Sequence, residues 1–263
     1  MVLSHIFIST SRISEVSTKN FLHIALVPAR SGSIGIRNKN LRNLGGKSLV
    51  KRAWDSCVNA DFFDVIMLST DSARIMKEID TGIAFSSLST DTVTFFKQNR
   101  AVHKRNKLDA QKYSSISDVL RKISHINELQ FDFLWLIQPT TPFRSKKEFL
   151  DLKKISESTI EYTSIVSVKD VTQSHPNRMF ELPGAYLEPI INNSQDVSVP
   201  RQMLSKVYIK DGGYYIFKKE QLQSGYFLGR KILPFERPSD LNVNIDTHSD
   251  LTYAKFISRK YNL

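Results

Sequence analysis

Four short and nearly continuous apolar runs constrain the fold of this 263-residue chain more than any other feature of its sequence. They lie at His23–Val27, Asp64–Ser69, Phe131–Ile137 and Thr163–Val168. Runs of this length, apolar at successive positions rather than at every second one, are typical of strands that are covered on both faces. Each run therefore predicts a strand inside a parallel sheet.

The segments between these runs carry apolar residues at helical spacing. One stripe consists of Leu49, Val50, Ala53, Trp54, Cys57 and Val58, and another consists of Ile116, Val119, Leu120 and Ile123. Strands that alternate with helices predict a doubly wound α/β sheet. Ligands of such folds bind at the carboxyl ends of the strands, so the residues that follow each run are the first candidates for function.

The first run is followed by a polar loop with the sequence PARSGSIGIRNKN, at Pro28–Asn40. Its glycines let the backbone approach a ligand closely, and exposed amides in such a loop form an anion-binding nest. Arg30, Arg37 and Lys39 add positive charge. An ordinary basic surface loop is the alternative. The spacing fits neither GxGxxG nor GxxxxGK[ST], which argues against a dinucleotide site or a P-loop.

The charge balance narrows the class of ligand. The chain holds 37 Lys and Arg against 26 Asp and Glu, a net charge of +11. A surplus of this size attracts polyanions, either nucleic acid or a small anion such as a nucleotide, although a solvated basic surface has the same composition. No nucleic-acid recognition module is evident, so we expect no nucleic-acid partner.

Cysteine content and hydropathy bear on the compartment. The single cysteine, Cys57, excludes an internal disulfide and favours a reducing, cytoplasmic environment. Cys57 falls on a predicted helical stripe, which favours a buried structural thiol over a nucleophile. No apolar run approaches the ~20 residues needed to cross a bilayer, so we expect no membrane partner.

Residues 1–20 differ in composition from the rest of the chain. They are rich in Ser and Thr and contain one acidic residue, Glu15. Because no small-residue cleavage site is evident, we interpret them as a flexible leader or an edge extension rather than a targeting signal. Residues 21–263 are then expected to form one domain.

Six segments, in a fixed order along the chain, resemble the signature motifs of one enzyme family. They are Pro28–Asn40 (similar to ARSGSxGxxNKN), Leu68–Asp71 (a second-strand STD motif), Ser114–Leu120 (a helix start containing SS), Leu136–Arg144 (LLQPTSPxR), Pro200–Gln202 with Asp211–Ile216 (PRQ…NGAIYI), and Asn244–Leu251 (DIDTxxDL). Together they resemble the CMP-nonulosonic acid synthetases, the N-acylneuraminate cytidylyltransferases. Synthetases for the eight-carbon acid KDO and sugar-1-phosphate nucleotidyltransferases are poorer matches.

The resemblance implies a reaction and an architecture. CTP and a nine-carbon 2-keto sugar acid would give the CMP-sugar and pyrophosphate, with Mg²⁺ (or Mn²⁺). The implied fold is a mostly parallel, Rossmann-like sheet of the nucleotide-diphospho-sugar transferase type. A small irregular lobe at about 170–211 would complete a homodimer and the neighbour's sugar site. A bound triphosphate would then order the polar loop at Pro28–Asn40, whose composition does not bury itself.

The resemblance also assigns candidate residues to the nucleotide. Those expected at the nucleotide are Ala29, Arg30, Ser31, Ser33, Asn40, Arg105 and Ser115, and those expected to be catalytic are Arg30, Lys39, Gln138 and Asp246. Asn38 and Asn40 either contact the nucleotide or brace the loop through hydrogen bonds. Ser115 either contacts the nucleotide or caps its helix.

Further residues are assigned to the sugar acid and the metal. The sugar candidates are Gln138, Arg201, Asp211 and Asn244, and Asp246 is the expected magnesium ligand because hard cations prefer carboxylate oxygens. The guanidinium of Arg201 suits a sugar carboxylate, with a plain rim arginine as the alternative. Gln138 could instead pin its turn, Asp246 could instead cap the last helix, and Arg144 could brace its loop or meet substrate.

Several positions depart from the family pattern. Ile34 stands where the family usually has lysine, Asp211 where it has Asn, and Asn244 where it has Asp. The arginine-bearing nucleotide loop, at Arg105–Lys112, lacks its usual aspartate, and an apparent insertion within Gly82–Val102 precedes it. These departures leave a second hypothesis open, in which the chain is a catalytically weak or inactive nucleotide-binding relative.

Overall fold

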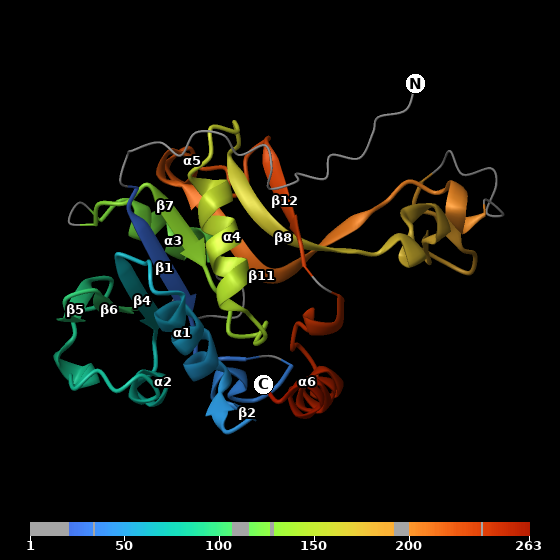
Figure 1. Ribbon diagram of the computed structural model, residues 1–263. Coiled ribbons are helices and arrows are strands. Elements are labelled where there is room, and N and C mark those ends of the chain that lie inside the picture. The colour runs from blue at the N-terminus through green and yellow to red at the C-terminus, as the bar shows by residue number, and fades with distance from the viewer. Residues whose placement is uncertain (1–20, 34, 107–115, 127–128, 192–199, 238) are drawn as a thin grey trace.

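The computed structural model describes residues 21–33, 35–106, 116–126, 129–191, 200–237 and 239–263. Its centre is an eight-stranded sheet with the strand order β12-β8-β11-β7-β1-β4-β6-β5 (Figure 1). The strands are β1 (His23–Pro28), β4 (Val65–Thr70), β5 (Val93–Lys97), β6 (Arg100–Lys104), β7 (Phe133–Leu136), β8 (Ser164–Asp170), β11 (Tyr208–Lys218) and β12 (Ile232–Glu236). Among these described strands, β5 and β11 run antiparallel to their neighbours and the other six share one direction.

The four strands predicted from the apolar runs are confirmed as β1, β4, β7 and β8, with ends that differ by one or two residues. Strand β1 is central and pairs in parallel with β4 on one side and with β7 on the other. Their carboxyl ends therefore meet at one edge of the sheet, which lies at the bottom of Figure 1.

Helices cover both faces of the sheet, as the alternation of strands and helices predicts. The helices are α1 (Leu49–Ala60), α2 (Ala73–Lys77), α3 (Ile116–Ser124), α4 (Lys146–Ser156), α5 (Lys219–Gln223) and α6 (His248–Tyr261). Ala25 and Val27 of β1 pack in the core cluster that includes α1 and α4, whereas Ile24 and Leu26 pack in the cluster that includes α3 and α5. Within the described ranges, no helix has the length and hydrophobicity that crossing a bilayer requires.

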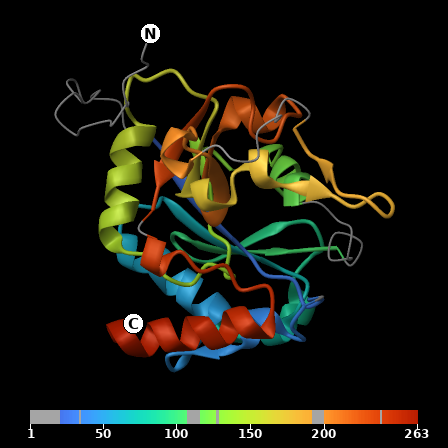
Figure 2. The ribbon, with the colours of Figure 1, turned by 90° about the vertical axis from the view of Figure 1, so that its right-hand side faces the viewer.

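A third core cluster joins the loop after β1 to the C-terminal helix. Ile36, in that loop, is fully buried and packs in one cluster with Ile245, Leu251 and Ala254. The same cluster includes Leu44 of β2 (Asn43–Leu44), which forms a small hairpin with β3 (Lys47–Ser48). Helix α6 lies beside this hairpin, below the carboxyl edge of the sheet (Figures 1 and 2).

The apparent insertion at Gly82–Val102 extends the sheet. It forms a short 3₁₀ helix, η3 (Phe85–Ser87), then β5, and most of β6. Strand β6 pairs in parallel with β4, and β5 closes that edge as the antiparallel half of a hairpin. Phe96 packs against Trp54 of α1 at a ring separation of 6.2 Å. The insertion therefore supplies the strand that ends beside Arg105.

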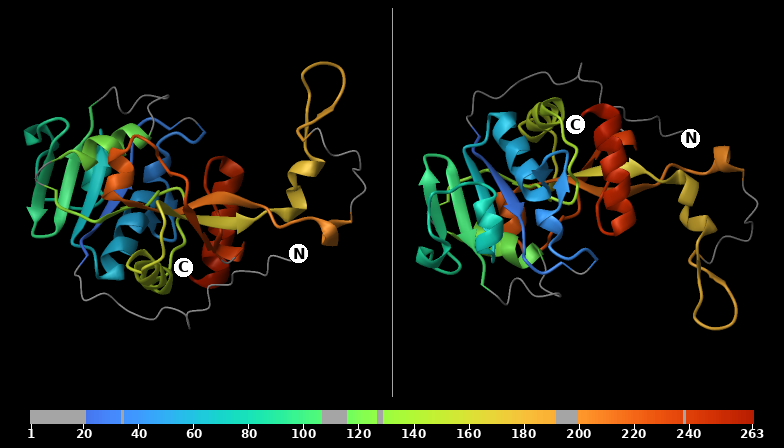
Figure 3. Two further views of the ribbon diagram at one scale, coloured as in Figure 1. Left: turned by 90° about the horizontal axis from the view of Figure 1, so that it is seen from above. Right: turned by 90° about the horizontal axis from the view of Figure 1, so that it is seen from below.

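Between β8 and β11 the chain leaves the body of the molecule and forms a projecting lobe (Figures 1 and 3). Its short elements are η5 (Thr172–Ser174), η6 (Pro176–Arg178), β9 (Phe180–Glu181), β10 (Glu188–Pro189) and η7 (Arg201–Met203). The sequence predicts an irregular dimerisation and sugar-binding lobe at about 170–211, and that role stays a prediction. Many large apolar side chains of the lobe are exposed, among them Leu182, Tyr186, Leu187, Ile190 and Met203.

A buried histidine links β1 to its neighbours. The indole N–H of Trp135 donates to Nδ1 of His23 at 3.0 Å, so Nδ1 carries no proton, and Nε2 lies 3.0 Å from Glu157 Oε1. Burial lowers the pKa of the His23 imidazole below its usual value, and the nearby Glu157 carboxylate only partly opposes this. Protonation at Nδ1 would break the Trp135 hydrogen bond, so the fold holds His23 neutral.

This arrangement predicts how stability depends on pH. The contribution of His23 is fully present above the pKa of an unfolded histidine, near 6.5, and is lost as the pH falls through the lower folded pKa. We expect the free energy of unfolding to decrease between pH 7 and pH 5.5, and His23→Gln to flatten that decrease. Urea denaturation across this range measures it, with His125→Gln as the exposed control. An equal slope in His23→Gln and wild type would contradict the prediction.

Candidate active site

A cavity of about 520 Å³ opens at the carboxyl edge of the sheet. Its lining consists of Pro28, Arg30, Ser33, Gly35, Lys39, Asn40, Arg105, Ile116, Gln138, Pro139, Thr140, Asn244 and Asp246. Eight of the residues predicted for the site lie in this lining: Arg30, Ser33, Lys39, Asn40, Arg105, Gln138, Asn244 and Asp246. They come from loops that follow β1, β6 and β7 and from the segment before α6, so the fold gathers residues that are far apart in the sequence.

The loop after β1 is held by protein groups. Asp71, at the end of β4, accepts from the backbone N–H of Ser31 at 2.7 Å and from its hydroxyl at 2.5 Å. Asn40 donates from Nδ2 to the carbonyl oxygen of Arg30 at 2.9 Å and thereby braces the loop. Ile36 is also buried against α6. Contacts within the chain therefore order this loop, contrary to the expectation that its residues do not bury themselves.

Three other predicted residues of this loop lie outside the lining of the main cavity. Ala29 is fully buried behind the cavity, and its N–H donates to the carbonyl oxygen of Ser69 at 2.9 Å. Asn38 adopts the left-handed conformation, with φ of 53°, at the start of η2 (Lys39–Leu41). The hydroxyl of Ser31 bonds to Asp71 and lies outside the lining of the main cavity.

Gly35 allows two backbones to meet. A Cβ atom at this position would overlap the main-chain carbonyl oxygen of Asp246 and lie 3.3 Å from its carbonyl carbon. The loop after β1 therefore lies directly against the segment that carries Asn244 and Asp246. At the cavity, this contact joins a loop near the start of the described chain to a segment near its end.

Asp246 is the centre of a small polar network. Its carboxylate accepts from Lys39 Nζ at 2.8 Å and from Asn244 Nδ2 at 2.6 Å, and its side chain is 63% exposed. Thr247, not Asp246, caps α6 and forms a capping box with Asp250. Partial burial raises the pKa of Asp250, but the N–H groups of Thr247 and Asp246 outweigh it and keep the pKa below its usual value. Asp246 thus remains available to the cavity.

Asp246 supplies the single carboxylate in the described lining, and this limits which metal ion the cavity could hold. Among the residues the structure describes, no group of three or more His, Cys, Asp or Glu side chains could hold a metal ion. Mg²⁺ commonly takes one or two protein carboxylates and completes its shell with water and substrate phosphates. The single carboxylate in the described lining suits a cation that arrives with a nucleotide, because each carboxylate oxygen can accept more than one partner.

Arg105 directly follows β6 and also lines the cavity. Its backbone N–H donates to the carbonyl oxygen of Thr70 at 2.9 Å, and its Nε donates to the hydroxyl of Ser69 at 2.8 Å. Ser69 also bonds to Nδ1 of His103 at 2.9 Å. These contacts fix a buried guanidinium in the cavity lining.

Gln138 and its loop are held by Arg144. The Arg144 guanidinium donates to the carbonyl oxygen of Gln138 at 2.8 Å and to that of Gly213 at 2.9 and 3.0 Å. Burial lowers the pKa of Arg144 to about 10, well inside the range in which it stays charged at neutral pH. Of the two roles considered for Arg144, the structure therefore supports bracing of the loop.

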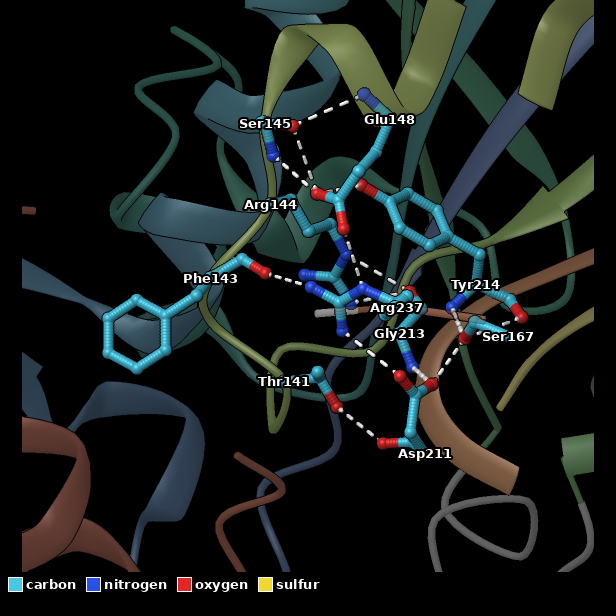
Figure 4. A network of polar contacts seen from close by, with 10 residues as sticks. All are labelled: Thr141, Phe143, Arg144, Ser145, Glu148, Ser167, Asp211, Gly213, Tyr214 and Arg237. Atoms are coloured by element: carbon cyan, nitrogen blue, oxygen red, sulfur yellow. Dashed lines mark hydrogen bonds and ion pairs between the residues drawn. The ribbon is translucent and has the colours of Figure 1, made fainter. Parts of the chain in front are cut away.

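The position of Asp211 corrects the sequence prediction. Its side chain is fully buried and lies outside the cavity lining, so it does not face a ligand there. The carboxylate accepts from the hydroxyl of Ser167, from the N–H of Gly213 at 2.8 Å and from Arg237 Nη1 at 3.3 Å (Figure 4). Burial would be unfavourable for an isolated carboxylate, and these donors compensate it.

Sequence reasoning missed Arg237. No motif or spacing marks it, and its ion-pair partners lie 26 and 89 residues away along the chain. Three predicted features cannot be placed: Ile34, Ser115 and the side chain of Arg201 lie outside the described part of the structure.

Comparison with known proteins also indicates a similarity to cytidylyltransferases. The family model for cytidylyltransferases matches residues 24–92. The chain is 25% identical to the N-acylneuraminate cytidylyltransferase of Escherichia coli O18:K1:H7 over 91% of its length, and 27% identical to N-acylneuraminate cytidylyltransferase A of Danio rerio over 88%. By sequence, the chain is similar to N-acylneuraminate cytidylyltransferases. It spans about half the length of these curated relatives, 52% and 49% respectively.

Other matches differ in length or show the fold alone. The post-translational flagellin modification protein B of Campylobacter coli is 24% identical, with 91% of this chain and 96% of that protein covered. A solved CMP:2-keto-3-deoxy-manno-octonic acid synthetase in complex with CTP superposes with a TM-score of 0.61 at 14% identity, covering 91% of this chain and 99% of that one. A 4-diphosphocytidyl-2C-methyl-D-erythritol synthase from Anaerococcus prevotii gives 0.59 at 14% identity, with 91% and 96% covered.

Two of the departures from the cytidylyltransferase pattern have partners in the structure. Asn244 donates an amide hydrogen to Asp246, whereas an aspartate at this position would place a second carboxylate against the first. Asp211 pairs with Arg237, which neutralises its charge. Neither departure leaves an unpaired charge in the site.

The contact at Gly35 predicts the effect of a single methyl group. We expect Gly35→Ala to separate the loop after β1 from Asp246, because the added Cβ overlaps a main-chain oxygen that cannot rotate away. Isothermal titration calorimetry, with CTP as the probe because a similar solved synthetase is in complex with it, should show an affinity more than tenfold below that of the wild type. Gly184→Ala is the matched control, since a Cβ at Gly184 meets nothing within 4 Å. Equal CTP affinities in the two variants would contradict the prediction.

Proposed function

We propose that the chain transfers CMP from CTP to the anomeric hydroxyl of a nine-carbon 2-keto sugar acid of the sialic, legionaminic or pseudaminic type, releasing pyrophosphate. One observation carries the proposal. A single cavity at the carboxyl edge of the sheet is lined by eight residues that the family resemblance assigns to nucleotide, sugar and metal. The proposal rests on these residues being together, because the curated relatives are longer proteins and the solved structures share only the fold.

In this proposal the loop after β1 binds the triphosphate. Arg30 and Lys39 contribute positive charge to the cavity, and Ser33 contributes a hydroxyl. Arg105, held by its hydrogen bond to Ser69, serves the base or the ribose. Because phosphoryl transfer depends on positioning and on neutralising phosphate oxygens, cations on one wall of a preformed cavity are the groups such a reaction requires.

The sugar acid binds on the side of Gln138 and Asn244. The side chains of both residues line the cavity and can accept or donate hydrogen bonds to sugar hydroxyls. Arg201, by resemblance, pairs with the sugar carboxylate. The anomeric oxygen then attacks the α-phosphorus as the bond to pyrophosphate breaks, and the residues of the cavity hold both reactants in line.

We propose Mg²⁺ (or Mn²⁺) as the cofactor, with Asp246 as its protein ligand. When bound, the ion neutralises charge on the phosphate oxygens. Lys39 Nζ donates to the Asp246 carboxylate at 2.8 Å and orients it toward the cavity. Asn244 orients the second carboxylate oxygen.

Pyrophosphate release tests the proposed reaction. We expect turnover with CTP, Mg²⁺ and one member of a panel of nonulosonic acids, and none with ATP, GTP or UTP. Lys39→Met should lower kcat by about 100-fold or more, because it removes a cation from the developing phosphate charge. Lys154→Met, on the exposed face of α4, is the control.

Failure of this assay has a defined meaning. If the protein binds CTP and turns over none of the sugar acids, the chain is the catalytically inactive, nucleotide-binding relative that the departures at Ile34, Asp211 and Asn244 left open. If it binds no CTP, both versions of the proposal are wrong.

We also propose that the chain forms a homodimer through the lobe. The lobe projects from the body (Figure 3). It exposes large apolar side chains, with Tyr186 82% exposed. Exposed apolar patches of this kind are typical of surfaces that another protein covers. A second copy is the occupant that the family resemblance implies.

The dimer predicts a change in mass. We expect Tyr186→Lys combined with Leu187→Lys to shift the protein from dimer to monomer in light scattering coupled to size exclusion, because two charges would be buried at the interface. Tyr226→Lys is the matched control, since Tyr226 is 74% exposed outside the lobe. A wild-type protein that is monomeric at micromolar concentration would contradict the proposed dimer.

A further inference from the structure

Three positions in β11 depart from the family pattern. The segment Asp211–Ile216 reads DGGYYI where the pattern is NGAIYI, so Asn is replaced by Asp211, Ala by Gly213 and Ile by Tyr214. All three positions lie against the same side chain, that of Arg237. This shared partner suggests that the substitutions belong to one structural unit.

Arg237 is a buried cation that joins three parts of the fold. The residue is 3% exposed, and its guanidinium donates to Glu148 Oε1 of α4 at 2.8 Å, to Asp211 Oδ2 at 3.3 Å, and to the carbonyl oxygen of Phe143 (Figure 4). Burial alone would lower the pKa of Arg237, but Glu148 and Asp211 outweigh it and hold the pKa above its usual value. The guanidinium also lies over the ring of Tyr214, 5.3 Å from its centroid.

Arg237 occupies the space that an alanine side chain would need at position 213. A Cβ atom there would lie 2.5 Å from Arg237 Nη1, 3.0 Å from Arg237 Cδ and 3.0 Å from the hydroxyl of Ser167. The guanidinium cannot move aside without breaking its contacts with Glu148 and Phe143. Alanine at 213 would therefore force Arg237 to shift at the cost of these contacts, whereas glycine leaves them intact.

The same unit sets a bulge that faces the sugar side of the cavity. Asp211 accepts from the N–H of Gly213, and the register of β11 against β8 shifts between Lys210 and Tyr215. Within this bulge, Gly212 has φ of 78°, and a Cβ there would lie 3.1 Å from Gln138 Oε1 and 3.8 Å from Asn244 Oδ1. The bulge therefore abuts the two side chains proposed to bind the sugar acid.

A second link runs from the bulge to the same loop. Arg144 donates to the carbonyl oxygens of both Gly213 and Gln138, so a displacement of Gly213 changes the support of Gln138. Arg237 reaches the same loop directly through Phe143. Bulges of this kind commonly adjust the direction of side chains beside active sites.

We propose that Arg237 is a positioning residue for the sugar-acid end of the site, acting through Asp211 and Gly213 as one co-substituted unit. The inference deepens the proposed function and rests on it for the identity of the ligand. Asp211 does not contact the sugar. Its charge instead holds Arg237, which fixes the bulge against Gln138 and Asn244.

Kinetics of an Arg237 variant distinguish positioning from general destabilisation. We expect Arg237→Met to raise KM for the sugar acid by up to about 100-fold, the effect of a small misplacement, while KM for CTP changes less than about threefold. Arg230→Met, at an exposed arginine, should change neither. Equal increases in both KM values would overturn the proposal. If Arg237→Met does not fold, Ser167→Ala, which removes one hydrogen bond to Asp211, should show the same selectivity at smaller magnitude.

The co-substitution makes a sharper prediction. Gly213→Ala alone should impair sugar-acid use as strongly as Arg237→Met, because the added methyl group displaces the guanidinium. The triple variant Asp211→Asn, Gly213→Ala, Arg237→Met restores the family pattern at 211 and 213, and it should recover most of the lost efficiency. If Gly213→Ala lowers the efficiency equally with and without Arg237→Met, positions 213 and 237 act independently and the proposal is wrong.

Hydrogen exchange provides a readout that needs no turnover. In the ligand-free protein, the amides of Thr141, Gly213 and Tyr214 should exchange at least about tenfold faster in Arg237→Met than in wild type, as expected when a local structural unit opens more readily. Arg230→Met should leave them unchanged. A wild type that is inactive with every sugar acid would refute the proposed function, whereas unchanged exchange in Arg237→Met would refute the positioning role.

Discussion

The candidate site depends on the close approach of two backbone segments, at Gly35 and Asp246. One belongs to the loop after the central strand and the other precedes the last helix, so this contact joins the two walls of the cavity. Ile36 stabilises this contact by packing against α6, and Lys39 stabilises it by pairing with Asp246. The parallel sheet brings the strand ends together, but this contact gives the space between them a defined shape.

Buried charges are the second organising feature of the site. Arg144 and Arg237 lie on the same aromatic ring, that of Tyr214, and both donate to carbonyl oxygens of the loop after β7 or of the bulge in β11. Buried ion pairs add little net stability because desolvation offsets their attraction. Their contribution here is geometric, since each guanidinium fixes several acceptors from different elements at once.

The sequence predicted the fold well where local pattern determines structure. Strands β1, β4, β7 and β8 are covered on both faces and therefore read as continuous apolar runs, whereas β5 and β12 lie at the sheet edges and β11 contains a bulge, which breaks any simple pattern. Loop residues at strand ends could be predicted to line the cavity, because the topology of a parallel sheet brings the ends of its strands to one edge. The burial of Asp211 and the role of Arg237 depend on partners distant in the chain, and no local signal encodes such pairing.

The pairing of Lys39 with Asp246 has a consequence for the proposed reaction. The two side chains balance each other's charge, so together they add no net charge to the cavity. In the proposed reaction, a triphosphate and its cation would offer each of the two side chains a new partner of the same sign as the old one. Ligand binding would then be an exchange of ionic partners and not a creation of new charge.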